Sequence, residues 1–391
     1  MTLIHHRLFL MWVLPVRHCL NESPFSRRFD MSTLRRPIFR ITAAALAVSV
    51  LAACGGGSAS PDGTSPDGSN ATTPGQGIGV TYPLTGLPIE DKAAAARPAL
   101  VAKIDNHPAA RPQTGLNKAD IVFEENVEAL TRFAAVFHSQ GSDPVGPLRS
   151  GRTQDIDILG SFNKPLFAWS GGNYRVTRAI SKSDLVNVGY SASRGKGGYY
   201  RAKDKKIPHN LFAKTSNLWT LAPTDAVPPQ QQFTYRGSSD AKPATSTAVD
   251  GAKVSMYNVK VYWKWDAATS NFIRFTENLK RELEPHMADD GQVNTKNVVV
   301  LYVTYVRSKA DRKSPDAVTT GKGTGFVMTD GGLIPINWVR PNRLVPFTLT
   351  DANGAVVRMT PGRTWVELAW KNSLAPVGPG IDPKTVKFPA V

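Results

Sequence analysis

The sequence has only two cysteines, Cys19 and Cys54, among its 391 residues. Two cysteines are too few for a disulfide-stapled scaffold or a cysteine-rich metal site. No apolar run reaches the roughly 18–20 residues that a membrane-spanning helix needs, which excludes a polytopic membrane protein. The hydrophobic content of 41% suffices for one or two ordinary cores, so wholesale disorder and fibrous classes are excluded as well.

Acidic residues are scarce beside basic ones, at 31 against 47. Residues 1–53 hold seven basic and two acidic residues, so the chain from residue 54 onward keeps a net charge of +11. If the protein is exported, its electrostatic partners are anionic lipid headgroups and anionic wall polymers rather than nucleic acid. The alternative is that the positive charge only aids solubility.

Export is indicated by the segment 31–54. Three arginines between residues 35 and 40 precede an apolar, small-residue stretch at 41–53, which is too short to span a bilayer. The stretch ends in Leu-Ala-Ala-Cys at 51–54, followed by glycines, and this resembles a bacterial lipobox. The alternative is an ordinary secretory signal that has a cysteine at its cleavage site.

A lipobox implies that the Cys54 thiol receives a diacylglyceryl group and becomes the mature N-terminus. We therefore expect residues 1–53 to be an over-extended start plus a lipoprotein signal peptide, with Met31 as the initiator. The protein would be a palmitate-bearing lipoprotein on the extracytoplasmic face of the cell membrane. An acylated Cys54 leaves no thiol for a disulfide or for cysteine-dependent wall transpeptidation.

Composition divides the remaining chain into four parts. Residues 54–81 are rich in Gly, Ser, Pro and Thr and predict a disordered tether. We expect a mixed α/β N-terminal domain over 82–221, a Pro- and Gln-rich linker over 222–246 and a β-rich C-terminal domain over 247–391. The predicted fold class is therefore α+β or layered α/β, with a mixed N-terminal sheet and helices followed by strands.

Periodicity gives the elements within these regions. In the N-terminal region it predicts strands over 99–105, 120–124, 132–138 and 165–169, and helices over 150–162, 174–183 and 209–221. In the C-terminal region, alternation over 259–266 and a five-residue turn before 272–275 predict a hairpin. The apolar segment 297–306 predicts a central strand, and further strands are expected over 323–328, 333–339, 345–349 and 364–369.

Several motif clusters, taken in order, resemble the YerB lipoprotein family, whose paired domains are of unknown function. The clusters are 83–88, 97–98, 105–108, 110–113, 119–124, 127–128, 131–133, 146–152, 208–210, 297–299, 321–325 and 361–365. They cover nearly everything from residue 82 onward. The resemblance implies a tethered envelope lipoprotein with an α/β N-terminal domain and a β-rich partner, and it implies no reaction.

Two carboxylates and an arginine are spaced by four: Glu124, Glu128 and Arg132. Spacing by four places side chains on one face of either a strand or a helix, so we expect the three to share a face. Two carboxylates beside a guanidinium could act as acid and base in glycan cleavage, which makes Glu124 and Glu128 weak catalytic candidates. The alternative is a ladder of ion pairs at the surface.

An anion site is predicted around the segment 146–152, in which Arg149, Ser150 and Arg152 lie at the start of a predicted helix. Arginine binds carboxylate or phosphate with two parallel hydrogen bonds, and a helix N-terminus adds free N–H donors. The alternative is that both arginines pair internally with Glu124, Glu128 or Asp155.

The other candidate ligand-binding residues lie in loops, where binding sites often occur. They are Asp105, Asn106, His107 and Arg111 after a predicted strand, and His209 and Asn210 before a predicted helix. No histidine spacing matches a metal site, and no Gly-rich loop opens a helix, so we expect no metal and no cofactor. A further basic loop at 194–206, which contains two tyrosines, suits anionic or glycan polymers or is simply solvated.

These features favour a non-enzymatic envelope lipoprotein that binds an anionic ligand or cell-wall polymer. A second hypothesis is a carboxylate-dependent cell-wall glycan hydrolase. A third is a scaffold for another envelope protein.

Overall fold

The structure is a computed structural model that describes residues 80–237 and 239–390. The predicted signal, Cys54 and nearly all of the predicted tether lie outside the described residues. Within the described part of the chain, no helix is long and apolar enough to cross a membrane.

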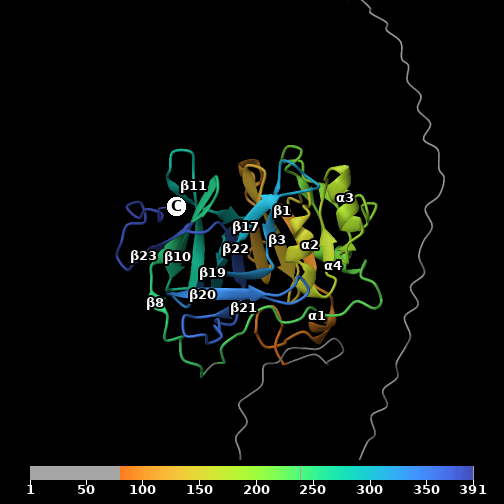
Figure 1. Cartoon of the computed structure of the whole chain (residues 1–391). Helices are drawn as coiled ribbons and strands as arrows, with labels where there is room; N and C mark the ends of the chain where they lie inside the picture. The colour runs from red at the N-terminus through yellow and green to blue at the C-terminus, as the bar shows by residue number, and fades with distance from the viewer. Residues whose placement is uncertain (1–79, 238, 391) are drawn as a thin grey trace, which may run out of the picture. The chain divides into compact units, whose positions relative to one another are not determined.

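A large mixed sheet runs through the centre of the molecule, in the order β21-β20-β19-β16-β22-β2-β3-β1-β4-β5, with β8 beside β20 (Figure 1). Its strands come from both halves of the chain, and β2 pairs in parallel with β22 at the junction. The two predicted regions therefore share one sheet. The strands are β1 Leu100–Asp105, β2 Ile121–Val127, β3 Leu130–Phe137, β4 Leu166–Ala168, β5 Val186–Asn187, β8 Thr247–Ala248, β16 Asn297–Tyr302, β19 Gly321–Thr329, β20 Gly332–Arg340, β21 Thr348–Thr350 and β22 Thr364–Ala369.

A second sheet, formed by the later half of the chain alone, has the order β12-β11-β10-β9-β23, with β15 beside β11. Its strands are β9 Gly251–Met256, β10 Val259–Asp266, β11 Asn271–Glu277, β12 Leu283–Pro285, β15 Asn294–Thr295 and β23 Leu374–Val377. Three two-stranded ribbons complete the strands: β6 Tyr200–Arg201 with β7 Leu211–Phe212, β13 Met287–Ala288 with β14 Gly291–Gln292, and β17 Thr304–Arg307 with β18 Pro315–Val318.

Each face of the central sheet buries its own core, because successive residues of a strand point to opposite faces. One core contains Leu100, Ala102 and Ile104 of β1 and also Trp263 and Phe272 of the second sheet, so it lies between the two sheets. The other core contains Ala99 and Val101 together with helical residues such as Ile158, Val176 and Ile180. Figure 1 shows the second sheet on the left of the view and the helices on the right.

The helices are short: α1 Lys92–Ala96, α2 Gln154–Ile158, α3 Tyr174–Ser181, α4 Thr215–Trp219 and the 3₁₀ turns Pro108–Ala110 and Gly160–Phe162. The β-rich character of the chain is confirmed, but the layered α/β arrangement expected for the first region is not. Apart from the segment 297–306, the predicted strands are confirmed to within about three residues, as is the helix over 174–183.

Three predicted elements are wrong in extent. The helix expected over 150–162 is only α2 and a 3₁₀ turn, which ends where Asn163 takes a left-handed φ of 56°. The segment 209–221 begins as β7, because Leu211 is buried and its carbonyl accepts from the Leu148 N–H. The segment 297–306 leaves the central sheet after Tyr302 and continues in a separate ribbon.

Candidate anion-binding site

Charged side chains gather where the parallel strands of the central sheet end. Strands β1 and β2 are both antiparallel to β3, and β2 is parallel to β22, so their carboxyl ends lie at one edge. Ligands of open α/β sheets bind beyond such an edge. Each of these strands ends in buried polar residues, namely Lys103 and Asp105 of β1, Glu124 and Glu125 of β2, and Glu367 of β22.

Four residues from three segments meet at the end of β1, and we call them the His–Arg cluster: Asp105, His107, Arg149 and His209. The His209 Nδ1 donates to Asp105 Oδ2 at 2.6 Å, and Arg149 Nε lies 3.0 Å from the same oxygen. The rings of His107 and His209 stack with centroids 4.2 Å apart. Asp105 is 5% exposed, whereas His209 is 14% and Arg149 24% exposed. The buried carboxylate thus holds a partly exposed guanidinium, which has further N–H donors, beside a partly exposed imidazole.

The ring of His107 is held in a defined state. Its Nδ1 accepts a hydrogen bond from the Ala109 N–H at 3.1 Å, so the ring proton of the neutral form is on Nε2. Its own backbone N–H donates to Asp105 Oδ1. Burial lowers the pKa of His107, and the nearby His209 and Arg149 add to the lowering against the opposing effect of Asp105. The neutral form, with its proton on Nε2, is therefore favoured.

Asn210 is not free to reach a ligand, since it fixes the loop beside the cluster. Its Nδ2 donates to the carbonyls of Ala202 and Lys205, and its Oδ1 accepts from Arg201. The Lys205 ammonium in turn donates to the Arg111 carbonyl at 2.9 Å. The basic loop found in the sequence is thereby tied to the edge of the site.

Glu124 and Asn106 face the opposite side of the sheet and belong to a polar network buried between the two sheets. Glu124 pairs with Arg274 at 2.8 Å, and both side chains have no exposed surface. Asn106 donates to Thr131, whose hydroxyl donates to Glu124 at 2.6 Å. Arg111 extends the network through Asn106 and Thr276.

A second carboxyl group, Glu367, lies beside Glu124 in the paired strand β22. Burial raises the pKa of Glu367 well above its usual range, and the charge of Glu124 adds to the effect. Glu367 accepts from the Trp263 indole at 2.9 Å. Glu367 is therefore the protonated member of the pair, so that the positive charge of Arg274 is matched by one carboxylate, that of Glu124.

The side of the sheet that bears Asp105 holds another buried charge group. Lys103 pairs with Glu125 and, at 2.7 Å, with Asp155 of α2, and none of the three is exposed. Burial raises the pKa of Glu125 to about 7, to which the charge of Asp155 contributes.

Arg152 is one of the three arginines predicted to bind a ligand, and its side chain is 5% exposed. It donates to Glu128 at 2.6 Å and to Ser314 at 2.6 Å. Ser150 accepts from Arg132 through its backbone carbonyl. The internal pairing considered as the alternative therefore describes Arg152, while Arg149 remains partly exposed in the His–Arg cluster.

The expectation that Glu124, Glu128 and Arg132 share one face is wrong. Glu128 lies in the β2–β3 turn with a left-handed φ of 50°, so the segment is a hairpin rather than one element. Glu124 pairs across the ladder with Phe133, whereas Arg132 pairs with Glu125 and points to the other face. The two weak catalytic candidates are consequently separated by the sheet.

Sequence reasoning missed the buried members of these networks, which are Lys103, Arg274, His286 and Glu367. A signal existed for two of them, because Lys103 and Glu367 each interrupt an otherwise apolar strand. Burial of an ionised group is costly unless it is paired, so such an interruption indicates an ion pair. Within residues 80–237 and 239–390, no group of His, Cys, Asp or Glu is arranged to hold a metal ion.

Comparison of the sequence and the fold with known proteins shows which family this chain belongs to. Residues 84–228 match the N-terminal domain, and residues 232–366 the C-terminal domain, of the protein family of unknown function DUF3048. The chain is 29% identical over 303 residues to "Putative lipoprotein YerB" of Bacillus subtilis, covering 73% of this chain and 85% of that protein. The crystal structure of the YerB protein superposes with a TM-score of 0.62 at 20% identity, over 80% of this chain and 100% of that chain. The chain therefore belongs to the DUF3048 family, to which the YerB resemblance of its motifs pointed.

Proposed function

We propose that this protein is an extracytoplasmic lipoprotein, anchored through Cys54, whose His–Arg cluster binds an anionic group of an envelope ligand or cell-wall polymer. The anchor is supported by the lipobox-like segment at 51–54 and by the lipoprotein name of the Bacillus subtilis relative. It places the folded part of the chain outside the membrane, within reach of anionic wall polymers.

One observation carries the binding proposal: the single carboxylate of Asp105 holds Arg149 and His209 together at a partly exposed edge. The Nε of Arg149 faces Asp105 at 3.0 Å, and among the described residues no hydrogen bond involves its two Nη groups. The edge formed by these two Nη groups suits a phosphate or carboxylate, and the Nε2–H of His107 adds a neutral donor.

The geometry supports binding over glycan hydrolysis. A glycosidase needs two carboxyl groups that flank the scissile bond in an open site. Glu124 has no exposed surface and is committed to Arg274, and Glu128 lies on the β2–β3 turn bonded to Arg152. A scaffold role is a separate outcome, which would appear as co-purification with one envelope protein and no binding to wall material.

The anchor is tested by labelling cells with radioactive palmitate. The proposal expects label on the peptide that contains Cys54, and loss of both label and membrane fractionation in Cys54→Ala. An unlabelled protein that fractionates with cytosol would contradict the anchor.

Binding is tested by pull-down of the full chain on purified wall material, with affinity expected to fall as salt rises. The double variant Arg149→Ala/His209→Gln removes the charged guanidinium donor and the imidazole ring that stacks on His107, and it should weaken binding at least about tenfold. The matched control is Arg343→Ala, because Arg343 is 29% exposed and paired with Asp184 at 2.9 Å. Unchanged binding in the double variant, or equal weakening in the control, would refute the assignment.

A further inference from the structure

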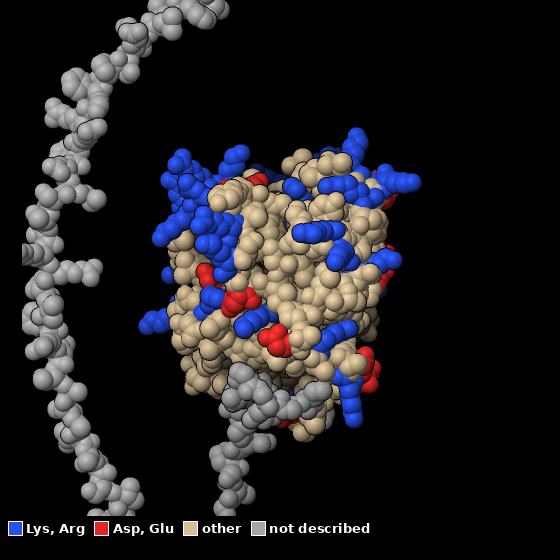
Figure 2. All heavy atoms as spheres, turned by 90° about the vertical axis from the view of Figure 1, so that its right-hand side faces the viewer, with Lys and Arg blue, Asp and Glu red and all other residues tan. Residues whose placement is uncertain are grey.

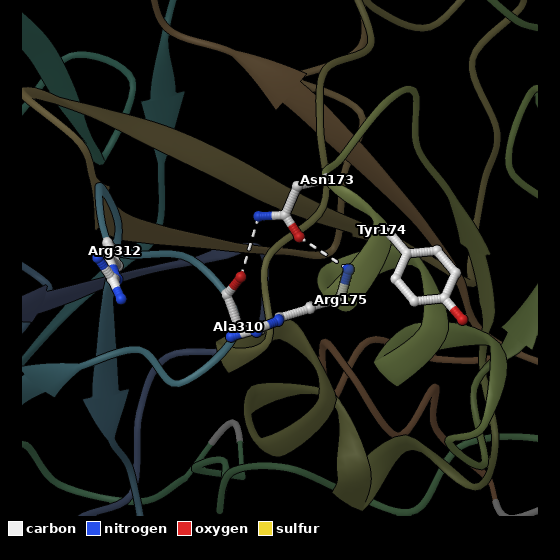
Figure 3. Close-up of a pocket in the computed structure, with 5 residues that line it drawn as sticks. All are labelled: Asn173, Tyr174, Arg175, Ala310 and Arg312. Atoms are coloured by element: carbon white, nitrogen blue, oxygen red, sulfur yellow. Dashed lines mark hydrogen bonds between the residues drawn. The ribbon is translucent and has the colours of Figure 1, made fainter. Parts of the chain in front are cut away.

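A second basic feature lies apart from the His–Arg cluster, between α3 and the loop that joins β17 to β18. Two adjoining cavities of about 400 and 390 Å³ open there and share Arg175 and Ala310 in their walls. Figure 3 shows the first cavity, with Asn173, Tyr174 and Arg175 on one side and Ala310 and Arg312 on the other. The two cavities together form one elongated groove.

The groove is lined by four cations: Arg175 and Arg312, and further along it Arg307 and Lys309. Among the described residues no salt bridge involves any of the four. The one carboxylate in the lining is Asp316, which accepts from the Thr153 hydroxyl at 2.7 Å. Figure 2 shows that Lys and Arg side chains gather at an upper corner of the side of the molecule that carries the helices, with few acidic side chains among them.

The walls of the groove are fixed by hydrogen bonds that do not use these cations. Asn173 caps α3 by accepting from the backbone of Arg175 and donates to the Ala310 carbonyl at 3.0 Å, which joins the two walls. Arg152 donates to Ser314 at the far end of the loop. The cations are therefore presented by a preorganised loop and helix, which lowers the cost of ordering them on binding.

We propose that this groove binds an extended polyanion that carries phosphate groups along its chain. Four unpaired cations along an elongated hollow match a row of anions, and guanidinium groups bind phosphate with paired hydrogen bonds. The Tyr174 side chain, 74% exposed at one end, offers a ring face to the linking groups. A single polymer chain is favoured over a membrane surface because the cations line the walls of two adjoining cavities rather than one flat face. The groove site is independent of the cluster proposed above.

The test uses the full chain in non-ionic detergent and linear inorganic polyphosphate as the probe, with affinity measured over a range of salt. Arg175→Ala/Arg312→Ala should weaken binding about tenfold or more. It should also lower the slope of log K against log salt by roughly one for each lost phosphate contact. Lys264→Ala/Lys280→Ala is the control, since both lysines are exposed and lie away from the groove, on β10 and in the β11–β12 turn. Circular dichroism and thermal unfolding verify that the variants fold.

We expect the groove variant to lose affinity for polyphosphate. The lysine control and Arg149→Ala/His209→Gln should keep the affinity of the unaltered protein. Equal binding by the groove variant and the unaltered protein, or equal loss in the lysine control, would overturn the proposal. Binding to phosphatidylglycerol vesicles without binding to polyphosphate would overturn it in favour of a lipid surface. Loss only in the cluster variant would assign polyphosphate to the His–Arg cluster and leave the groove without a ligand.

Discussion

Replacing Arg274 with methionine tests whether the network between the two sheets holds them together. Arg274 has no exposed surface, pairs with Glu124 at 2.8 Å and contacts His286. Its guanidinium carbon also lies 5.3 to 5.8 Å from the ring centres of Trp263, Phe133 and Trp365. Methionine has similar length and keeps most of the apolar contacts, so the substitution removes mainly the charge.

The expected loss of unfolding free energy follows from the buried carboxylate of Glu124 that the substitution leaves without its partner. Removing one partner of a buried ion pair leaves an uncompensated charge and costs about 3–5 kcal/mol. Here the neighbouring Glu367 carries a proton and can donate to the abandoned carboxylate of Glu124, so we expect the lower half of that range, about 3–4 kcal/mol. Glu124→Gln keeps an oxygen for Thr131 and Arg274, and it should cost only about 1.5–3 kcal/mol, the value of a hydrogen bond to a charged group.

The assay is urea unfolding of the four proteins of a double-mutant cycle, followed by circular dichroism. Arg274→Met with Glu124→Gln should be less destabilised than the sum of the single variants, by about 1–3 kcal/mol. Additive free energies of unfolding would refute the pairing. A loss of less than about 1 kcal/mol in Arg274→Met would refute the claim that Arg274 is a buried partner.

Three further outcomes are expected. Burial raises the pKa of Glu125 from its usual 4.5 to about 7 in the folded protein. Protonated Glu125 therefore contributes its full stability below about pH 4.5, and this contribution is lost as pH rises through 7. Glu125→Gln should flatten the dependence of the unfolding free energy on pH over this range. Because the pKa of His107 is lowered, binding of wall material should strengthen only below about pH 6.5; His107→Gln, whose amide N–H replaces the neutral Nε2–H donor, should remove that rise and largely retain affinity at pH 8. A Cβ added at Gly325 would lie 2.0 Å from the Val300 carbonyl, so Gly325→Ala should cost more than about 2 kcal/mol in chemical unfolding, and a smaller loss would contradict the close approach of β16 and β19.

Much of the fold could be predicted from local pattern, because alternation along a strand reflects one buried and one exposed face. The strand over 99–105 and the hairpin from 259 to 275 were located in this way. The junction of β2 with β22 could not be, since the two strands are separated by more than 230 residues and local pattern carries no pairing information. For this reason two compositional regions were predicted where the strands form one sheet.

For the candidate site, too, the local sequence pattern predicts residue types but not which distant segments meet. The types of residue were predictable, because Asp105, His107, Arg149 and His209 all lie in polar loop motifs. Their meeting was not, since His209 is 104 positions from Asp105 and approaches through β7 in a segment predicted to be helical. For Arg152 the sequence left two possibilities open, an anion or an internal carboxylate, and the structure shows the internal pair with Glu128 on the hairpin turn.

The central claim is that an anionic ligand contacts the exposed edge of the His–Arg cluster, and histidine side-chain NMR tests it most directly. The chain from Cys54 onward has four histidines: His107 and His209 in the cluster, and the buried His138 and His286. Soluble wall-polymer fragments should shift the imidazole nitrogen resonances of His107 and His209 and leave those of His138 and His286 in place. Unmoved resonances from His107 and His209 at saturating fragment would contradict the claim.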